Sequence, residues 1–158
     1  MTFGKELIRE KVGTMEWTWE NLRITDETER VDLDAVCALL STSYWAADRD
    51  RETIAASVRG SLCLSAFVGD RQVGFLRAVT DRATFAWICD VIVDEAYRGR
   101  RIGKRLMETA LEHPAIRDTN MGLATRDAHG LYERYGFVRR EAMARTKNQT
   151  ALIGRSGL

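Results

Sequence analysis

A short basic segment, residues 97–105, has the residue types of this 158-residue chain best suited to binding an anionic ligand. It reads Tyr-Arg-Gly-Arg-Arg-Ile-Gly-Lys-Arg and lies between an apolar β-type run (85–93) and a helix-periodic run (102–111). A strand that turns through glycines into a helix presents several unpaired backbone N–H groups at one point. Together with the positive end of the helix dipole, these groups form a site for phosphate. The segment therefore predicts a polyphosphate site at a strand-to-helix turn.

Two common phosphate-binding motifs do not fit this segment. A P-loop needs Gly-x-x-x-x-Gly-Lys-Ser/Thr, whereas Gly99 and Gly103 stand one residue too close together and Arg105 replaces the hydroxyl residue. A dinucleotide-binding fingerprint needs Gly-x-Gly-x-x-Gly, and the glycine spacing differs here too. A basic run with two glycines is, taken alone, equally consistent with a solvated surface, so the surrounding elements must decide.

The composition indicates a soluble globular protein. Hydrophobic residues make up 45% of the chain, charged residues 30%, and the net charge is +1. A nearly neutral chain has no global field that attracts nucleic acid or an anionic membrane, so a small anionic ligand is favoured. No apolar run approaches the roughly 18–20 residues that span a bilayer, and no export signal is visible at the N-terminus. Three widely spaced cysteines in apolar segments (Cys37, Cys63, Cys89) favour free thiols in a reducing cytoplasm and no metal site.

The elements that precede the basic segment follow from the spacing of apolar residues. Residues 1–16 are charged without clear periodicity and are expected to form a loose N-terminal extension. A first strand is expected at 17–24, a helix capped by Asp32 after it, and a second helix at 51–58. From residue 62 the apolar residues instead recur at every second position, as in a strand. Residues 62–68 and 73–79 predict a hairpin around Gly69-Asp70, and 84–93 adds a third strand.

After the basic segment, a helix at 102–111 is expected to stop at Pro114. A strand at 121–125, a helix at 128–135 and a last strand at 137–144 follow, and the tail at 146–158 is left open. We therefore expect one domain over 17–145.

This order of elements predicts an α+β (mixed α/β) fold. An N-terminal antiparallel meander followed by strand–helix–strand–helix–strand gives a mixed central sheet with helices on both faces. Where pairing changes from antiparallel to parallel, neighbouring strands can splay apart. Ligands bind beyond the carboxyl ends of strands at such points, and the basic segment follows one of those ends.

Two segments of the chain resemble motifs of the GNAT superfamily of N-acetyltransferases. Residues 98–103 (Arg-Gly-Arg-Arg-Ile-Gly) resemble the acyl-CoA signature Gln/Arg-x-x-Gly-x-Gly/Ala, and 131–137 (Leu-Tyr-Glu-Arg-Tyr-Gly-Phe) resemble Leu-Tyr-x-Lys-x-Gly-Phe. Arg101 stands where the family has its first motif glycine. If the backbone there needs a positive φ, a non-glycine residue costs on the order of 1 kcal/mol. If only the N–H is needed, Arg101 keeps it and adds positive charge.

The resemblance implies a GNAT-like fold with acetyl-CoA as cosubstrate and no metal. The amine would attack the thioester directly in a ternary complex, without a covalent enzyme intermediate. The backbone of Ile92 and Val93 would pair with the pantetheine arm. The pyrophosphate would be held by the residues of the basic turn, which are Arg98, Gly99, Arg100, Arg101, Ile102, Gly103 and Lys104.

The same resemblance assigns Tyr132 as the general acid that protonates the leaving thiolate, because a phenol with a pKa near 10 is protonated at neutral pH. The base is left open between a side chain and water. Family members carry it at positions matching Trp87 or Cys89, and neither residue suits that role. Asp90 is a weaker candidate because strand alternation places it on the face of Ile88 and Ile92, opposite Cys89.

The acceptor side is expected around the first two helices, where Tyr44 and Trp45 could form one wall of an amine pocket. The leading hypothesis is an acetyl-CoA-dependent N-acetyltransferase acting on a primary amine of a small molecule or peptide. The alternative is a non-catalytic acyl-CoA-binding or sensing module. Nucleic-acid binding is disfavoured by the net charge, and a homodimer is an expectation from the resemblance alone.

Overall fold

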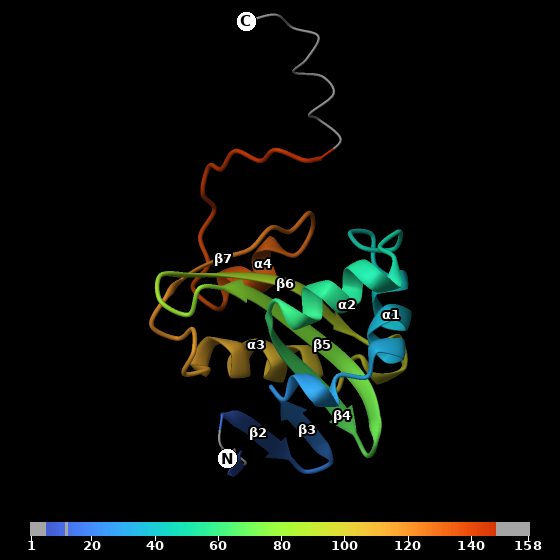
Figure 1. Ribbon diagram of the computed structural model, residues 1–158. Coiled ribbons are helices and arrows are strands. Elements are labelled where there is room, and N and C mark those ends of the chain that lie inside the picture. The colour runs from blue at the N-terminus through green and yellow to red at the C-terminus, as the bar shows by residue number, and fades with distance from the viewer. Residues whose placement is uncertain (1–5, 12, 148–158) are drawn as a thin grey trace, which may run out of the picture. The chain divides into compact units, whose positions relative to one another are not determined.

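The computed structural model describes residues 6–11 and 13–147 of the chain (Figure 1). It forms two compact units, with the boundary between Ala124 and Thr125. The expected single domain at 17–145 includes this boundary, and the expected tail lies mostly outside the described residues.

A seven-stranded sheet forms the centre of the first unit, and its strands follow one another in chain order. Neighbouring strands are antiparallel up to β6, whereas β6 and β7 are parallel, which confirms the mixed sheet. The strands are β1 (Glu6–Lys11), β2 (Thr14–Trp19), β3 (Leu22–Thr25), β4 (Leu62–Val68), β5 (Arg71–Thr80), β6 (Phe85–Val93) and β7 (Asn120–Gly122).

Helices cover both faces of this sheet (Figure 1). On β5, Phe75 packs in a core with Val36 and Ile54 of the first two helices. A Cβ on the preceding Gly74 would instead lie 3.2 Å from Ile102 and Leu106 of the third helix, so consecutive residues face opposite layers. The helices of this unit are α1 (Leu33–Ser41), α2 (Arg51–Arg59), α3 (Ile102–Glu112) and the 3₁₀ helices η1 (Thr28–Arg30) and η2 (Glu95–Tyr97).

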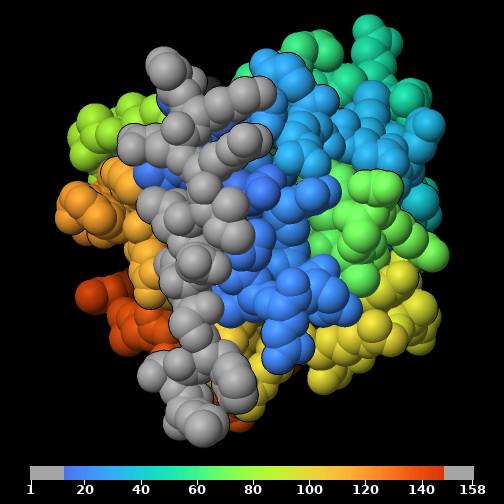
Figure 2. All heavy atoms as spheres, turned by 90° about the horizontal axis from the view of Figure 1, so that it is seen from below, coloured from blue at the N-terminus to red at the C-terminus, as the bar shows by residue number. Residues whose placement is uncertain are grey.

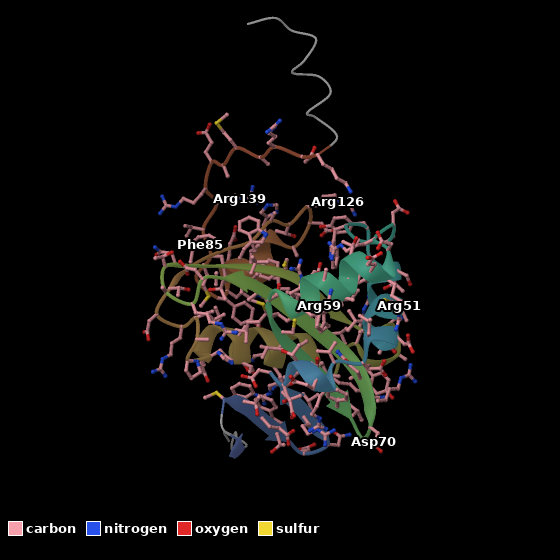
Figure 3. All side chains as sticks on the ribbon, viewed as in Figure 1. Arg51, Arg59, Asp70, Phe85, Arg126 and Arg139 are labelled. Carbon is pink, nitrogen blue, oxygen red and sulfur yellow. The ribbon has the colours of Figure 1, made fainter. Side chains whose placement is uncertain are left out.

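The N-terminal part of the sheet differs from the sequence expectation in two ways. The single strand expected at 17–24 is a hairpin of β2 and β3, because Glu20 turns the chain with a φ of 49°. Residues 6–11, expected in a loose extension, pair with β2 as β1. Figure 2 shows the blue residues of β2 and β3 beside the green β4–β5 hairpin, whose tip is marked by Asp70 in Figure 3.

The parallel strands β6 and β7 separate after a short paired stretch. Their pairing ends where Trp87 meets Gly122, whereas β6 continues to Val93. Gly122 lets the Phe85 and Trp87 rings pack closely here, because a Cβ at this position would lie 2.9 Å from the Phe85 ring and 3.0 Å from the Trp87 ring, and the rings would have to shift. Beyond Trp87, β6 therefore has a described strand partner only on its β5 side, as expected for a ligand-binding splay.

A β-bulge interrupts β6 at Asp90. Phe75 pairs with Ile92 and Arg77 with Cys89, so Asp90 and the next residue together oppose a single residue of β5. Asp90 has a φ of 53°, a left-handed conformation that Asp tolerates better than most residues. The bulge corrects the alternation expected from sequence. Directly opposed residues share a face, so Cys89 and Ile92 both lie on the α1–α2 face with Asp90, and Ile88 lies on the other.

The second unit contains the short helix α4 (His129–Glu133). Gly136, in the turn that follows this helix, has a φ of 85°, and the N–H of Phe137 donates to the carbonyl of Tyr132 at 3.3 Å. The strand expected at 137–144 is not formed. Val138 and Met143 of this segment are exposed, and no strand of the described residues pairs with it. None of the described helices has the length and hydropathy to cross a bilayer.

Candidate functional site

The N-terminus of α3 is open to an anion. Asp32 caps α1 and Asp50 caps α2 by accepting backbone N–H groups, whereas α3 has no side-chain cap and no acidic residue in its first turn. Within the described residues, the backbone N–H groups of 99–104 donate to no acceptor. Unpaired N–H groups and the helix dipole act together there on a negative charge. The phosphate site expected from sequence at this helix start stays a prediction.

The turn into α3 uses two left-handed residues, Gly99 with a φ of 79° and Arg101 with a φ of 63°. The backbone therefore has a positive φ at the position where the family signature has glycine, and in this chain Arg101 takes that conformation. Its N–H is kept among the unpaired donors of the turn. Both alternatives considered for Arg101 thus apply together: the backbone is strained, and the donor is retained.

Among the described residues, some basic side chains of this segment contact aromatic rings or acidic residues of the protein, and others do not. Arg105 lies over the Trp19 ring at 5.1 Å and pairs with Glu108 at 3.3 Å. Arg100 lies over the Tyr97 ring at 4.9 Å. Arg98 and Arg101 are exposed and have no ion pair or ring contact within the described part of the chain. Their charge is available to an anion at the helix N-terminus.

The end of β6 leads directly to this turn. The Ile92 side chain is buried in the α1–α2 core, whereas Val93 faces α3, where it lies 3.6 Å from a Cβ placed on Gly103. Both residues pair with β5 on one side. Their other edge faces the gap left by β7, so their free backbone groups are suited to pairing with an extended ligand.

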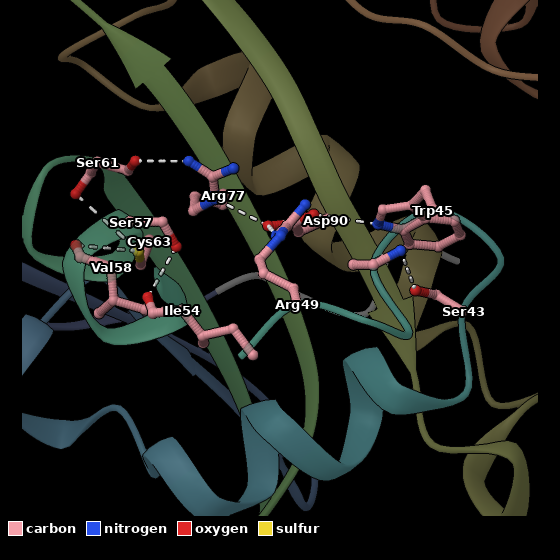
Figure 4. A network of polar contacts seen from close by, with 11 residues as sticks. Ser43, Trp45, Arg49, Ile54, Ser57, Val58, Ser61, Cys63, Arg77 and Asp90 are labelled. Atoms are coloured by element: carbon pink, nitrogen blue, oxygen red, sulfur yellow. Dashed lines mark hydrogen bonds and ion pairs between the residues drawn. The ribbon is translucent and has the colours of Figure 1, made fainter. Parts of the chain in front are cut away.

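Asp90 is the centre of a buried polar network on the α1–α2 face (Figure 4). Its Oδ1 accepts from the Trp45 indole N–H at 3.0 Å. Its Oδ2 accepts from Arg49 and from Arg77, each at 2.8 Å. Arg77 also donates to the Ser61 hydroxyl at 3.0 Å, which extends the network to the end of α2.

The charges of this network set the ionisation of Asp90. Burial alone would raise the pKa of the carboxyl group, but hydrogen bonds from Arg77 and Arg49 and their positive charges outweigh it, so the pKa is lowered. The neighbouring Cys89 thiol has a raised pKa because it is partly buried. A carboxylate with a lowered pKa and three donors is a weak proton acceptor, which favours a structural role for Asp90 over that of the base.

The two residues expected to wall the acceptor pocket lie in the connection between α1 and α2. Tyr44 and Trp45 pack edge to face with ring centroids 5.1 Å apart, and both rings are exposed. The indole N–H of Trp45 points inward to Asp90, so the ring is held at one end while its surface faces solvent. The two rings thus form an exposed aromatic surface tied to Asp90 at one end, and their part in an acceptor pocket stays a prediction.

Tyr132, the expected general acid, belongs to the second unit. Its ring packs edge to face with Phe137 at 6.1 Å, across the turn made by Gly136. Tyr132, Gly136 and Phe137 of the second motif therefore have a local structural reason. The catalytic role of Tyr132 stays a prediction.

Sequence reasoning did not single out Arg49 and Arg77, the two partners of Asp90. Arg77 gave a usable signal, because an arginine within the apolar strand Val73 to Val79 needs a buried counter-charge. Arg49 gave none, since it lies in a charged connection and is brought to Asp90 only by the fold.

The chain matches known acetyltransferases in sequence and structure. A family model for the acetyltransferase (GNAT) domain matches residues 42–139. A Xanthomonas campestris pv. campestris protein belonging to the GNAT family is 36% identical, with a TM-score of 0.76 over 79% of this chain and 92% of that one.

More distant structures share the fold. A GNAT family acetyltransferase from Streptococcus pneumoniae is 25% identical, with a TM-score of 0.61 over 80% of this chain and 97% of that one. Glucosamine-6-phosphate N-acetyltransferase from Arabidopsis thaliana is 13% identical, with a TM-score of 0.59 over 79% and 97% of the two chains. The family match and the 36% identity over most of the chain agree with the open helix N-terminus beside splayed strands, and the chain belongs to the GNAT acetyltransferase family.

Proposed function

We propose that this acetyltransferase transfers the acetyl group of acetyl-CoA directly to a primary amine of a small molecule or peptide, in a ternary complex. The open N-terminus of α3 beside the splay of β6 and β7 is the observation that carries the proposal. The unpaired N–H groups of 99–104 would bind the pyrophosphate, with charge from Arg98 and Arg101. The free edge of Ile92 and Val93 would pair with the pantetheine arm.

In this reaction the amine nitrogen attacks the thioester carbonyl carbon. An amide C–N bond forms, the C–S bond breaks, and the thiolate takes a proton from the Tyr132 hydroxyl. The proton released by the amine nitrogen passes to water, since Asp90 is already occupied by three donors, and water returns a proton to the Tyr132 phenolate. The aromatic surface of Tyr44 and Trp45 would orient the acceptor.

A panel of primary amines tests the proposal, with release of free CoA thiol as the readout. Turnover with at least one amine supports it. Gly103→Glu should abolish acetyl-CoA binding because it places a carboxylate at the open helix end. Gly103→Ala is the matched control, since its Cβ makes only an ordinary 3.6 Å contact with Val93. Unchanged binding by the Glu variant would refute the pyrophosphate site.

A non-catalytic acyl-CoA-binding module is the second candidate. The observation that favours it is the pairing of the Asp90 carboxylate with Arg49 and Arg77, which leaves this part of the site without a free carboxylate base. Acetyl-CoA binding that is lost in Gly103→Glu, together with no turnover of any amine, would support this candidate over the enzyme.

A further inference from the structure

Three donors from two distant segments converge on the Asp90 carboxylate. Trp45 and Arg49 come from the connection between α1 and α2 (residues 42–50, here called the acceptor loop), and Arg77 comes from β5. The side chain of Asp90 is 1% exposed, Arg77 12% and Arg49 24%. The cluster therefore joins the acceptor loop to the bulge of β6 in a largely desolvated environment.

The arrangement is specific for a carboxylate at position 90. Every partner donates a hydrogen bond, so the group they surround must accept on both of its oxygens. An asparagine amide would turn its NH₂ toward Trp45 or toward the arginines and leave donors facing donors. The left-handed backbone of Asp90 adds a second requirement, because few residues other than Gly, Asn and Asp adopt it readily.

The cluster is better suited to fixing a conformation than to adding stability. Buried ion pairs contribute little net stability compared with apolar packing of similar volume, since desolvation opposes the attraction. The two arginines also leave the cluster with a net positive charge. This cluster lies between the acceptor loop and β6, the strand that leads to the cofactor turn. Its desolvation cost and its position indicate that it holds these two segments in a defined arrangement.

We propose that Asp90 is a positioning residue that anchors the acceptor loop on the β6 bulge. Through Trp45 and Arg49 it holds the aromatic acceptor surface in a fixed orientation relative to the end of β6, where the thioester is expected. This inference rests on the proposed function for its kinetic consequence. Its structural part, the anchoring of residues 42–50, does not depend on catalysis.

Two variants release the loop while keeping the Asp90–Arg77 pair. Trp45→Phe removes the indole N–H but preserves an aromatic surface, and Arg49→Gln removes one charged donor. The matched control is Arg51→Gln on α2 (Figure 3), whose ion pair with Asp34 is exposed and outside the cluster. Asp90→Asn disturbs all three contacts at once, so it is used only if its circular dichroism spectrum shows that it folds.

Hydrogen–deuterium exchange of residues 42–50 and steady-state kinetics are the two readouts. We expect faster exchange in the loop and about a tenfold loss of kcat/KM for the amine in Trp45→Phe and Arg49→Gln, the size expected from one lost buried hydrogen bond. The Kd for acetyl-CoA should be unchanged, and Arg51→Gln should resemble the wild type in every measurement.

The outcomes separate this inference from the proposed function. Unchanged exchange in both variants overturns the anchoring. Faster exchange with unchanged kcat/KM for the amine also overturns the positioning role, because it shows a merely structural contact. If the wild type acetylates no amine, the proposed function fails, and loop exchange alone then decides whether Asp90 anchors residues 42–50.

Discussion

Arg101 enters α3 through the left-handed region, with φ of 63° and ψ of 13°. This conformation costs an L-residue about 1–2 kcal/mol, a cost that glycine avoids. Arg101→Gly should therefore raise the unfolding temperature by about 2 °C, the shift expected from roughly 1 kcal/mol in a chain of this size once the backbone entropy of glycine is deducted. Thermal unfolding followed by circular dichroism measures this shift.

The same variant reports on the side chain of Arg101. Its N–H is retained in Arg101→Gly, so acetyl-CoA should still bind, with an affinity loss that is largest at low salt and shrinks as salt screens the missing charge. Arg101→Val is the opposing control, because a β-branched residue is strained further in this region. A lower unfolding temperature for the glycine variant would contradict the backbone argument.

Tyr132 can be tested without disturbing its packing. Tyr132→Phe keeps the ring that packs on Phe137 and removes only the hydroxyl. If the phenol protonates the thiolate, kcat should fall on the order of a hundredfold, the usual contribution of a general acid, while the Kd for acetyl-CoA changes little. Tyr135→Phe, in the turn that follows the same helix, makes the same chemical change and should leave kcat unaltered. Equal turnover in the two variants would remove Tyr132 from the mechanism.

At the scale of elements, His113 attaches the C-terminal end of α3 to the β2–β3 hairpin. Its Nδ1 accepts from the N–H of Ala115 at 3.1 Å, so Nε2 carries the proton that is donated to Asp26 at 2.8 Å. Asp26 accepts in turn from the N–H of Met15. The His113 ring also packs on Trp17 at 5.7 Å. The side chains of His113 and Asp26 are both buried, so this contact joins two distant elements away from solvent.

His113→Phe should lower the free energy of unfolding by about 1–3 kcal/mol, because it retains a ring beside Trp17 but leaves Oδ2 of the buried Asp26 carboxylate without its donor. Chemical denaturation measures the change. Acetyl-CoA affinity should be preserved, since α3 separates His113 from the open N-terminus by about 16 Å at 1.5 Å per residue. Arg117→Gln, an exposed control nearby, should have no measurable effect. A loss of cofactor affinity in His113→Phe would show that the two helix ends are coupled.

The elements differ in how far local sequence determines them. The β4–β5 hairpin and α3 were predictable because apolar spacing and turn residues such as Gly69 act locally. The β2–β3 turn was missed because Glu20 lacks the turn chemistry that normally accompanies a positive φ. The strand expected at 137–144 was not formed, because a strand is stabilised mainly by packing against neighbouring strands, and no described strand pairs with this segment.

The candidate site divides in the same way. The basic turn into α3 was predictable as a structure because its glycines, basic residues and helix start are contiguous in sequence, whereas its binding of phosphate stays a prediction. The Asp90 cluster was not, because it depends on a bulge in β6 and on Arg49, about forty residues earlier in the chain. A one-residue bulge reverses every later side chain of a strand, so no periodicity argument across Asp90 could assign its face.

At the scale of the whole molecule, folding lowers the pKa of several carboxyl groups. In Asp81 the cause is a hydrogen bond from the Thr84 hydroxyl, followed by backbone N–H groups of residues 83–85. In Asp50 the N–H and hydroxyl of Thr53 act in the same way. In Asp90 the two arginines outweigh the opposing effect of burial. Each of these groups is therefore harder to protonate in the folded chain than in the unfolded chain.

The sign of the resulting pH dependence follows from proton uptake. Between about pH 5 and the lowered pKa values, the unfolded chain binds more protons than the folded chain, so acid favours unfolding. Stability from these groups is complete above the usual carboxyl range near pH 4 and is lost as the pH falls through the folded pKa values. We expect the unfolding temperature to be nearly constant from pH 7 to 5 with respect to these groups and to fall steadily from pH 5 to 3. Asp81→Asn keeps an acceptor for the turn but cannot titrate, so its unfolding temperature should fall less over the acid range. Parallel slopes for this variant and the wild type would show that Asp81 does not contribute to the acid sensitivity of the fold.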